Sequence, residues 1–396
     1  MNLLTILCVV GIYAGQSIAG CPAIASDAAP PAFVEHATLP DPFLTFEGER
    51  VKSRSQWDCR RSELSQAFQQ LQYGVIPGAP ESLNASLDGN VLIIQAQSGD
   101  TAISFSVEIN MPESGEPPYP AMIHFGGVLM PASDGVADII YRNLELGQTP
   151  QIPDSPVNTG LFYTLHGQTI SAGLQASWVW GVSRIIDALE LVPESGIDPT
   201  RLGVTGCSRD AGAALAAGAF DERIVLTIPR EGGEGGDACF RITEAEKAST
   251  PYPCGPIMCE TRDFGLSRDF APHRDEPALL PFDQHELAGL IAPRALLVLQ
   301  NDITYLRPVS SFECMKAAHG VWEALGVPER MGVSMKGGHT HCQFPDDQRE
   351  LLAAFVDKFL VRDRDVDFDT GVVEYSGPDD IFLRRGWVKW EVPILE

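Results

Sequence analysis

Basic residues are scarce in this chain of 396 residues. Lys and Arg together number 28, against 53 Asp and Glu, so the formal net charge is −25 at pH 7. A strongly negative protein repels phosphates, which argues against binding of nucleic acid, of an anionic membrane or of a strongly anionic substrate. A neutral substrate is unaffected. The hydrophobic fraction of 44% excludes a disordered or fibrous chain.

Long apolar runs are also missing, since no stretch reaches the roughly 20 residues that span a bilayer. The one uncharged apolar run near the start lies within residues 1–20, and small residues that suit cleavage, Ser17 and Ala19, follow it. We interpret residues 1–20 as a signal peptide, although the usual basic residues are absent. The alternative is a bacterial lipoprotein box that ends at a lipidated Cys21. Either way, we expect a secreted, extracellular protein.

The cysteine count favours soluble secretion. Loss of Cys8 with the signal peptide leaves eight cysteines, an even number that predicts four disulfides, whereas lipidation of Cys21 would leave one unpaired. Asn84 opens an Asn-Ala-Ser sequon, which is consistent with glycosylation of a secreted protein. The nine cysteines are Cys8, Cys21, Cys59, Cys207, Cys239, Cys254, Cys259, Cys314 and Cys342.

Strand-like and helix-like segments alternate along the chain, which predicts an α/β fold with a mostly parallel sheet covered on both faces. No linker marks a second domain. Residues 21–60 read as an N-terminal wrap, and the break of the pattern over residues 230–290 reads as a functional insertion. The expected strands are Val91–Ala96, Ile103–Met111, Ala121–Phe125, Leu202–Val204, Arg223–Ile228, Ala295–Gln300 and Gly332–Met335; the expected helices are Trp178–Val192, Arg209–Phe220, Ser310–Leu325 and Asp346–Leu360.

A candidate nucleophile lies between one of these strands and the next helix. The segment VTGCSRD places Ser208 at a sharp strand-to-helix turn, the position of the nucleophile elbow in serine hydrolases. The usual glycine two residues later is Asp210 here, so the pattern is imperfect. The alternative is an ordinary turn in which Ser208 caps the helix.

A base is needed because a serine hydroxyl is a weak nucleophile until its proton can leave. GGHTHC follows the last expected strand and offers His339 and His341. A bridge between Cys207 and Cys342 would hold Ser208 beside His341, which makes His341 the better base and His339 a loop residue. Spacing alone cannot fix that pairing. A zinc site is the weaker alternative, since the other histidines lack metal-ligand spacing.

The acid of such a triad should fall between the serine and the histidine in chain order. Glu231 and Asp302 both follow expected strands, and either is possible. The backbone N–H of Arg209 is the natural first oxyanion donor, and its guanidinium could contribute. The loop HFGG at 124–127 could supply a second donor or be a plain glycine turn.

The chain resembles the glucuronoyl esterases of carbohydrate esterase family 15, and most closely their secreted fungal members. The resemblance rests on GCSR at 206–209, LTIPREGGEGGDACFRI at 226–242, LPFDQHELAGLIAPR at 280–294 and GGHTHCQFP at 337–345. It extends over nearly all of the chain after residue 20. It implies a single-domain α/β-hydrolase, a three-layer sandwich that needs no cofactor or metal. The implied substrates are esters between lignin alcohols and the 4-O-methyl-glucuronic acid of xylan.

By this resemblance, Ser208 is the nucleophile, His341 the base and Glu231 the acid, in preference to Asp302. The family's disulfides map onto Cys21–Cys59, Cys207–Cys342 and Cys239–Cys314, which leaves Cys254 and Cys259 for an extra bridge.

The sugar site departs from the family pattern. The family elbow reads G-C-S-R-N-G-K-G, so Gly212 stands where a pocket-facing lysine holds sugar hydroxyls. Loss of one charge-assisted hydrogen bond costs about 1.5–3 kcal/mol. Tyr305 matches a sugar-stacking tryptophan, and Glu260 falls near a sugar-site glutamate. We therefore expect a monomeric serine esterase that cleaves lignin–carbohydrate esters. The alternatives are the same triad with a shifted substrate, and a non-catalytic polysaccharide-binding protein.

Overall fold

The computed structural model describes residues 21, 31–32, 35–148, 158–247, 265–270, 273, 276–362, 373–375 and 386–396. Its centre is a ten-stranded sheet in the order β1-β2-β3-β5-β4-β6-β7-β8-β9-β10. The pairings among β1, β2, β3 and β5 are antiparallel, and all pairings from β5 through β10 are parallel. The expected mostly parallel sheet is thus confirmed. The strands are β1 (Ser82–Asp88), β2 (Val91–Ser98), β3 (Thr101–Asn110), β4 (Tyr119–Phe125), β5 (Ala137–Tyr141), β6 (Ile197–Cys207), β7 (Ile224–Arg230), β8 (Ala295–Gln300), β9 (Met331–Met335) and β10 (Val373–Tyr375).

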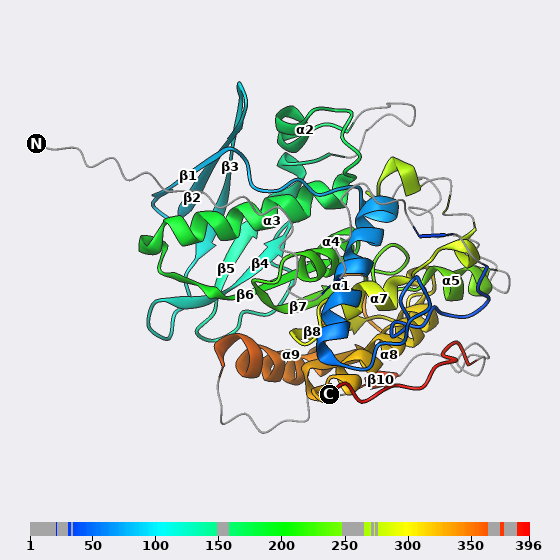
Figure 1. The fold of residues 1–396 in the computed structure, drawn as a ribbon. Helices are drawn as coiled ribbons and strands as arrows, with labels where there is room; N and C mark the ends of the chain where they lie inside the picture. The colour runs from blue at the N-terminus through cyan, green and yellow to red at the C-terminus, as the bar shows by residue number, and fades with distance from the viewer. Residues whose placement is uncertain are drawn as a thin grey trace, which may run out of the picture.

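Helices cover both faces of the sheet and complete three layers (Figure 1). One face carries most of them, and the other carries α9, drawn in orange, with the π-helical turn η9 that continues it. The larger helices are α1 (Arg54–Phe68), α3 (Leu174–Leu191), α4 (Arg209–Phe220) and α8 (Pro308–Ala324); the shorter ones are α2 (Leu161–His166), α5 (Phe240–Lys247), α7 (Gln284–Gly289), α9 (Arg349–Phe355) and η9 (Val356–Val361).

Strand β8 shows how the sheet separates two cores. Leu296 and Val298 belong to the large core under the main helix layer, whereas Leu297 and Leu299 belong to the smaller core that also contains Phe355 of α9. Side chains alternate between the two faces of a strand, so a strand buried on both sides must be apolar throughout. All six residues of β8 are buried, which explains why this strand could be predicted from its sequence.

Several elements lie outside the predictions. Strands β1, β5 and β10 were not predicted, because β1 is half exposed along its length and β5 and β10 have only five and three residues. Helix α1 begins at Arg54, so the expected wrap of residues 21–60 ends earlier than predicted. Its Trp57 is buried in the main core because the helix packs one face against the domain. Within the range 230–290, the structure describes α5 and α7 rather than loop alone.

Among the residues that the structure describes, none of the helices has the length and apolarity to traverse a bilayer. The expected signal peptide of residues 1–20 lies outside the described residues.

Candidate active site

Ser208 lies at the carboxyl end of β6 and immediately before α4, as the elbow pattern predicts. Its backbone has φ 63° and ψ −127°, a strained conformation for a residue with a side chain. Its hydroxyl forms no capping hydrogen bond with α4, so the helix-cap alternative is wrong. A Cβ on Gly206 would lie 2.3 Å from the carbonyl oxygen of Asp210. The tight turn therefore requires glycine at position 206.

Glu231 directly follows the neighbouring strand β7 and is almost completely buried. It also has a positive φ, 52°, and its N–H donates to the carbonyl of Leu299 on β8. Because β6, β7 and β8 are parallel, their carboxyl ends meet at one edge of the sheet. The sheet therefore brings Glu231 to the same edge as Ser208.

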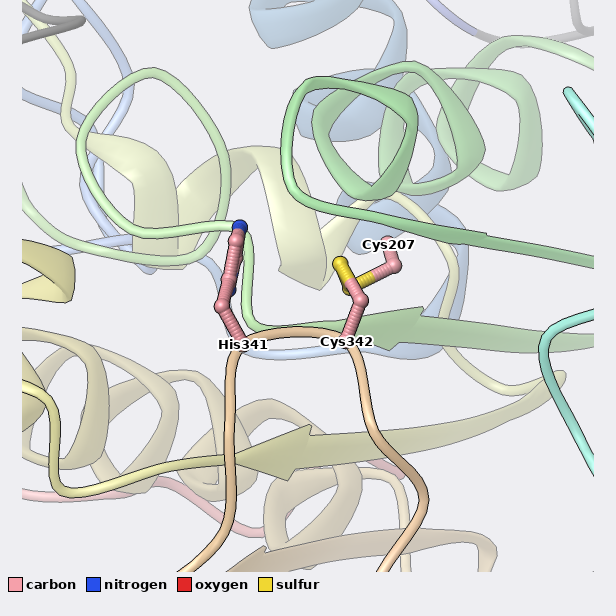
Figure 2. Close-up of side chains that lie close together, drawn as sticks. All are labelled: Cys207, His341 and Cys342. Atoms are coloured by element: carbon pink, nitrogen blue, oxygen red, sulfur yellow. A yellow bond between two sulfur atoms is a disulfide. The ribbon is translucent and has the colours of Figure 1, made fainter.

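The loop after β9 brings the histidine to this edge. A disulfide joins Cys342 to Cys207 with a Cα–Cα distance of 5.8 Å, so the residues next to them, His341 and Ser208, are held in neighbouring loops. Figure 2 shows His341 and Cys342 on one loop, with the disulfide reaching to the end of β6. This pairing was one of the alternatives open from the sequence.

Glu231 carries the decisive contact of the site. Its Oε2 lies 2.8 Å from His341 Nδ1 and accepts the N–H of Cys342 at 2.9 Å. Asn301 Nδ2 donates to the same oxygen at 3.4 Å. Asp302, the other acid candidate, is exposed, and its Oδ1 accepts the N–H of Gly338 at 3.3 Å. Asp302 therefore supports the turn before the histidines, while Glu231 holds the imidazole.

His339 is a loop-stabilising residue in this arrangement. Its Nε2 lies 3.0 Å from the carbonyl of Lys336, and its Nδ1 lies 3.1 Å from that of Thr340. Asn301 Nδ2 also lies 3.2 Å from Nδ1, so both ring nitrogens of His339 have protein partners. The two close sets of cysteine and histidine among the described residues are Cys207, His341 and Cys342, and Cys239, His285 and Cys314. In both sets the cysteines form disulfides, so their sulfurs are not thiolate ligands.

The start of α4 offers the expected oxyanion donors. The N–H of Arg209 is the first of the helix, where the backbone carries partial positive charge. Asp210, in the helix's first turn, accepts a hydrogen bond from Asn143 Nδ2 at 2.9 Å. Of the segment 124–127, His124 and Phe125 belong to β4, and the loop begins at Gly126. A Cβ on Gly126 would lie 2.9 Å from Asp210 Oδ2, so the start of this loop lies against the turn. Burial raises the pKa of Asp210, while Asn143 and the charge of Arg209 oppose that shift.

Comparison with known proteins places the chain among esterases. A family model described as glucuronyl esterase of fungi matches residues 94–326. The 4-O-methyl-glucuronoyl methylesterase of Hypocrea jecorina is 43% identical over 362 residues, which cover 91% of this chain and 76% of the relative. The protein of the same name from Neurospora crassa is 41% identical over 90% of this chain and 89% of the relative. The chain belongs to the glucuronyl esterase family.

Solved structures of glucuronoyl esterases share the fold. The catalytic domain from Hypocrea jecorina superposes with a TM-score of 0.87 at 41% identity, covering 93% of this chain and 100% of that chain. A serine-to-alanine mutant of the esterase from Sporotrichum thermophile, in complex with methyl 4-O-methyl-β-D-glucopyranuronate, gives 0.86 at 40% identity, covering 93% of this chain and 99% of that chain. Glucuronoyl esterases are carboxylic ester hydrolases with an α/β-hydrolase fold, and both predictions are confirmed.

Position 212 has no room for a side chain, although the family pattern has a sugar-binding lysine there. The resemblance implies that the family's lysine at this position faces the pocket, whereas Gly212 is buried against the loop that follows Glu231. A Cβ there would lie 2.9 Å from the carbonyl oxygen of Gly235 and 3.1 Å from the amide of Gln175. Because the closest atom belongs to the backbone, even alanine would displace the loop. A lysine at position 212 would meet the same loop, so Gly212→Lys is not expected to restore a sugar contact.

Tyr305 does lie beside the catalytic groups. Its ring meets that of His341 edge-on, with centroids 5.9 Å apart. Burial raises the pKa of its hydroxyl, and the charge of Glu231 adds to the shift. Tyr305 is therefore placed to contact a substrate bound at His341. Glu260 and the Cys254–Cys259 pair lie outside the described residues.

The other implied disulfides are present in the esterase. Cys21–Cys59 and Cys239–Cys314 close loops with sequence separations of 38 and 75. Asn84 is exposed on β1, the strand at the edge of the sheet, where a glycan would have room.

Two polar residues of the site escaped the sequence analysis. Asn301 donates to Glu231, and Asn143 donates to Asp210. Asn301 directly follows β8, and Asn143 follows β5 after one residue. Their position just after a buried strand is the same feature that pointed to Glu231 and Asp302, but only carboxylates were considered as candidates there.

Proposed function

We propose that this protein is a secreted, monomeric serine esterase that hydrolyses esters of 4-O-methyl-glucuronic acid, with Ser208, His341 and Glu231 as its catalytic triad. The single observation that carries the proposal is the 2.8 Å contact between His341 Nδ1 and Glu231 Oε2, on a loop bonded through Cys342 to the residue before Ser208. The relatives' names supply the substrate class, since they are 4-O-methyl-glucuronoyl methylesterases.

The first half of the reaction forms an acyl-enzyme. Ser208 Oγ attacks the carbonyl carbon of the uronate ester while His341 Nε2 takes the serine proton. The N–H of Arg209 donates to the oxygen that becomes negative, with its guanidinium and the loop at 124–127 alongside. Collapse of the tetrahedral intermediate breaks the bond to the alcohol, and His341 gives its proton to the departing alkoxide.

The second half releases the acid. Water loses a proton to His341 Nε2 and attacks the glucuronoyl–Ser208 ester. The imidazolium then returns the proton to Ser208 Oγ as the glucuronate leaves. Through both halves, Glu231 accepts a hydrogen bond from the Nδ1–H of His341 and stabilises the imidazolium. Its oxygen is held for this role by Cys342 and Asn301. None of these steps requires a cofactor.

The acidic protein suits this reaction. An esterified glucuronate is neutral when it enters, and the product is an anion that a net charge of −25 repels. We expect product inhibition to weaken at low salt, where the repulsion is least screened. The natural leaving group in this proposal is a lignin alcohol bound to glucuronoxylan.

One observation favours a second candidate, an esterase with the same triad and a shifted acyl specificity. Gly212 stands where the family pattern has a sugar-binding lysine, and a Cβ there would lie 2.9 Å from the carbonyl oxygen of Gly235. Such an enzyme would favour another uronate or a simple ester.

A substrate comparison tests the proposal. We expect the kcat/KM for benzyl and methyl esters of 4-O-methyl-glucuronate to exceed that for an aryl acetate, and Ser208→Ala to abolish all of these activities. Faster hydrolysis of the aryl acetate would favour the shifted substrate. Xylan binding without ester turnover would favour a binding protein.

A further inference from the structure

Arg230 is a buried cation at the centre of the catalytic edge. It ends β7, and its side chain is among the largest fully buried ones of the described residues. Its Nη1 donates to the carbonyl of Leu129, and its Nη2 donates to that of Cys342 at 3.1 Å. The guanidinium also lies over the ring of Phe344, 5.0 Å from the centroid. The side chain thus joins the loop after β4 to the loop that carries His341.

The backbone of the same residue contacts the other two catalytic positions. Its carbonyl accepts the N–H of Ser208 at 3.0 Å, and its peptide bond continues directly into Glu231. Arg230 therefore contacts the backbone of Ser208 and directly precedes Glu231. Its side chain also binds Cys342, the residue after His341. None of the roles in the triad mechanism above uses its side chain.

We propose that Arg230 is a positioning residue for the esterase reaction, whose guanidinium fixes the His341 loop against the loop that follows β4. The proposal rests on the triad assigned to Ser208, His341 and Glu231. Arg230 is too deeply buried to contact the substrate, so it acts through the two carbonyls that it binds.

The chemistry explains why an arginine stands here. A guanidinium is a planar fork that donates to two carbonyls in different directions and lies flat on a ring, whereas an ammonium does neither in a fixed geometry. Burial lowers the pKa of Arg230, and the nearby negative charge of Glu231 opposes that shift. Keeping a cation in this place carries a desolvation cost, which is consistent with a role beyond packing.

The test compares Arg230→Lys and Arg230→Met with a matched control, Arg294→Lys. Arg294 also donates to backbone carbonyls, those of Asp221 and Ile224 at 3.1 and 2.8 Å, but it precedes β8 at the opposite edge of the sheet. Lysine keeps the charge of Arg230, and methionine removes the charge with its desolvation cost. The readouts are kcat and KM for methyl 4-O-methyl-glucuronate, the rate of labelling by a fluorophosphonate, and the melting temperature.

We expect both Arg230 variants to lose about 10- to 100-fold in kcat, as misplacement of a catalytic group by about 1 Å does, with KM within threefold of wild type. Labelling should slow in proportion, because it uses the same serine and base but no sugar contact. Arg294→Lys should keep kcat within twofold of wild type, even if its melting temperature falls as much as that of the Arg230 variants. An Arg230 variant that is folded at the assay temperature and keeps wild-type kcat and labelling rate would overturn the proposal.

Failure of the assigned function gives a different pattern. A wild-type protein that is labelled but does not hydrolyse the glucuronate ester would contradict the substrate alone. The labelling rates of the three variants would then still decide the role of Arg230.

Discussion

Ser208, Glu231 and Cys342 have φ angles of 63°, 52° and 64°, in the left-handed region that favours glycine. They are three of the five such non-glycine residues in the described part of the chain, and all three belong to the proposed site. Conformations of this kind cost about 1–3 kcal/mol each and persist where surrounding structure enforces them. Here the N–H of Ser208 is bound by Arg230 and that of Glu231 by Leu299, while the disulfide holds Cys342.

The choice between the two acid candidates can be tested with a matched pair of amides. Glu231→Gln should lower kcat by about 10⁴-fold, the order found when a triad carboxylate becomes an amide, because an amide can stabilise the wrong imidazole tautomer. Asp302→Asn should keep kcat within about threefold of wild type, since Asp302 accepts the N–H of Gly338 in the turn before the histidines. Steady-state kinetics on the methyl ester measure both. Equal losses in the two variants would contradict the assignment.

Asp210 should give the esterase a pH dependence of its own. Burial raises the pKa of this carboxyl, so it takes up its negative charge at a higher pH than an exposed aspartate. Once ionised, it lies one residue from Arg209, the proposed oxyanion donor, and opposes the negative charge of the transition state, by on the order of 1 kcal/mol or about fivefold in rate. The ratio of kcat for Asp210→Asn to that of wild type should therefore rise with pH and then level off.

A pH series of kcat for both proteins checks this expectation. Asp198→Asn is a suitable control, because that carboxylate binds Thr200 and Arg201 at the far end of β6. A ratio for Asp210→Asn that stays constant across the series would show that the carboxyl does not act on the oxyanion.

At the scale of elements, the Cys207–Cys342 bridge connects the end of β6 to the loop after β9, across a sequence separation of 135. Replacement of both cysteines by alanine should lower stability by about 2–5 kcal/mol and also lower kcat, because the histidine loop loses its tether. The Cys239–Cys314 pair joins α8 to the start of α5 and serves as the control. Its removal should lower the melting temperature but leave kcat near wild type below that temperature. Unchanged kcat after loss of the Cys207–Cys342 bridge would contradict the tether.

The contact between α4 and the loop after Glu231 predicts a cost for any side chain at position 212. Gly212→Ala should lower the free energy of unfolding by about 1–3 kcal/mol, because the added methyl group meets the carbonyl oxygen of Gly235. Gly320→Ala in α8 is the matched control: its Cβ meets only a methyl group of Val392, and alanine favours helix by about 1 kcal/mol. Denaturant unfolding measures both, and equal stabilities for the two variants would rule out the close contact.

The sequence missed both edge strands of the sheet, β1 and β10, but predicted most of the strands between them, for a physical reason. Strands such as β8 are buried on both faces and must be continuously apolar, whereas β1 lies at the sheet edge with half-exposed residues and reads as a polar loop. Ser208 could be predicted from its turn between a strand and a helix. His341 could be preferred to His339 because a bridge between Cys207 and Cys342 would hold it beside Ser208. The strand pattern alone could not separate Glu231 from Asp302, and only the family resemblance favoured Glu231. Both residues follow adjacent parallel strands, and the backbone after each strand decides which carboxylate turns toward the imidazole.

For the molecule as a whole, the last residues of the chain connect the segment before α1, the start of α1 and the end of α8. The N–H of Leu39 donates to Trp387, that of Arg54 at the start of α1 donates to Glu396, and that of Leu395 donates to Ala324 of α8. Trp387 and Leu395 are buried in the main core. The C-terminal segment, residues 386–396, thus fixes the residues around α1 and α8. The proposed catalytic residues lie elsewhere, in the loops at the carboxyl edge of the sheet.

The central claim is that this esterase acts through one serine hydroxyl. It is tested most directly by partial labelling with a fluorophosphonate, followed by peptide mapping and by assay of the same samples on methyl 4-O-methyl-glucuronate. We predict that the label falls on Ser208 alone and that the lost activity equals the labelled fraction at every time point. Label on a different serine, or ester hydrolysis that survives complete modification of Ser208, would contradict the account.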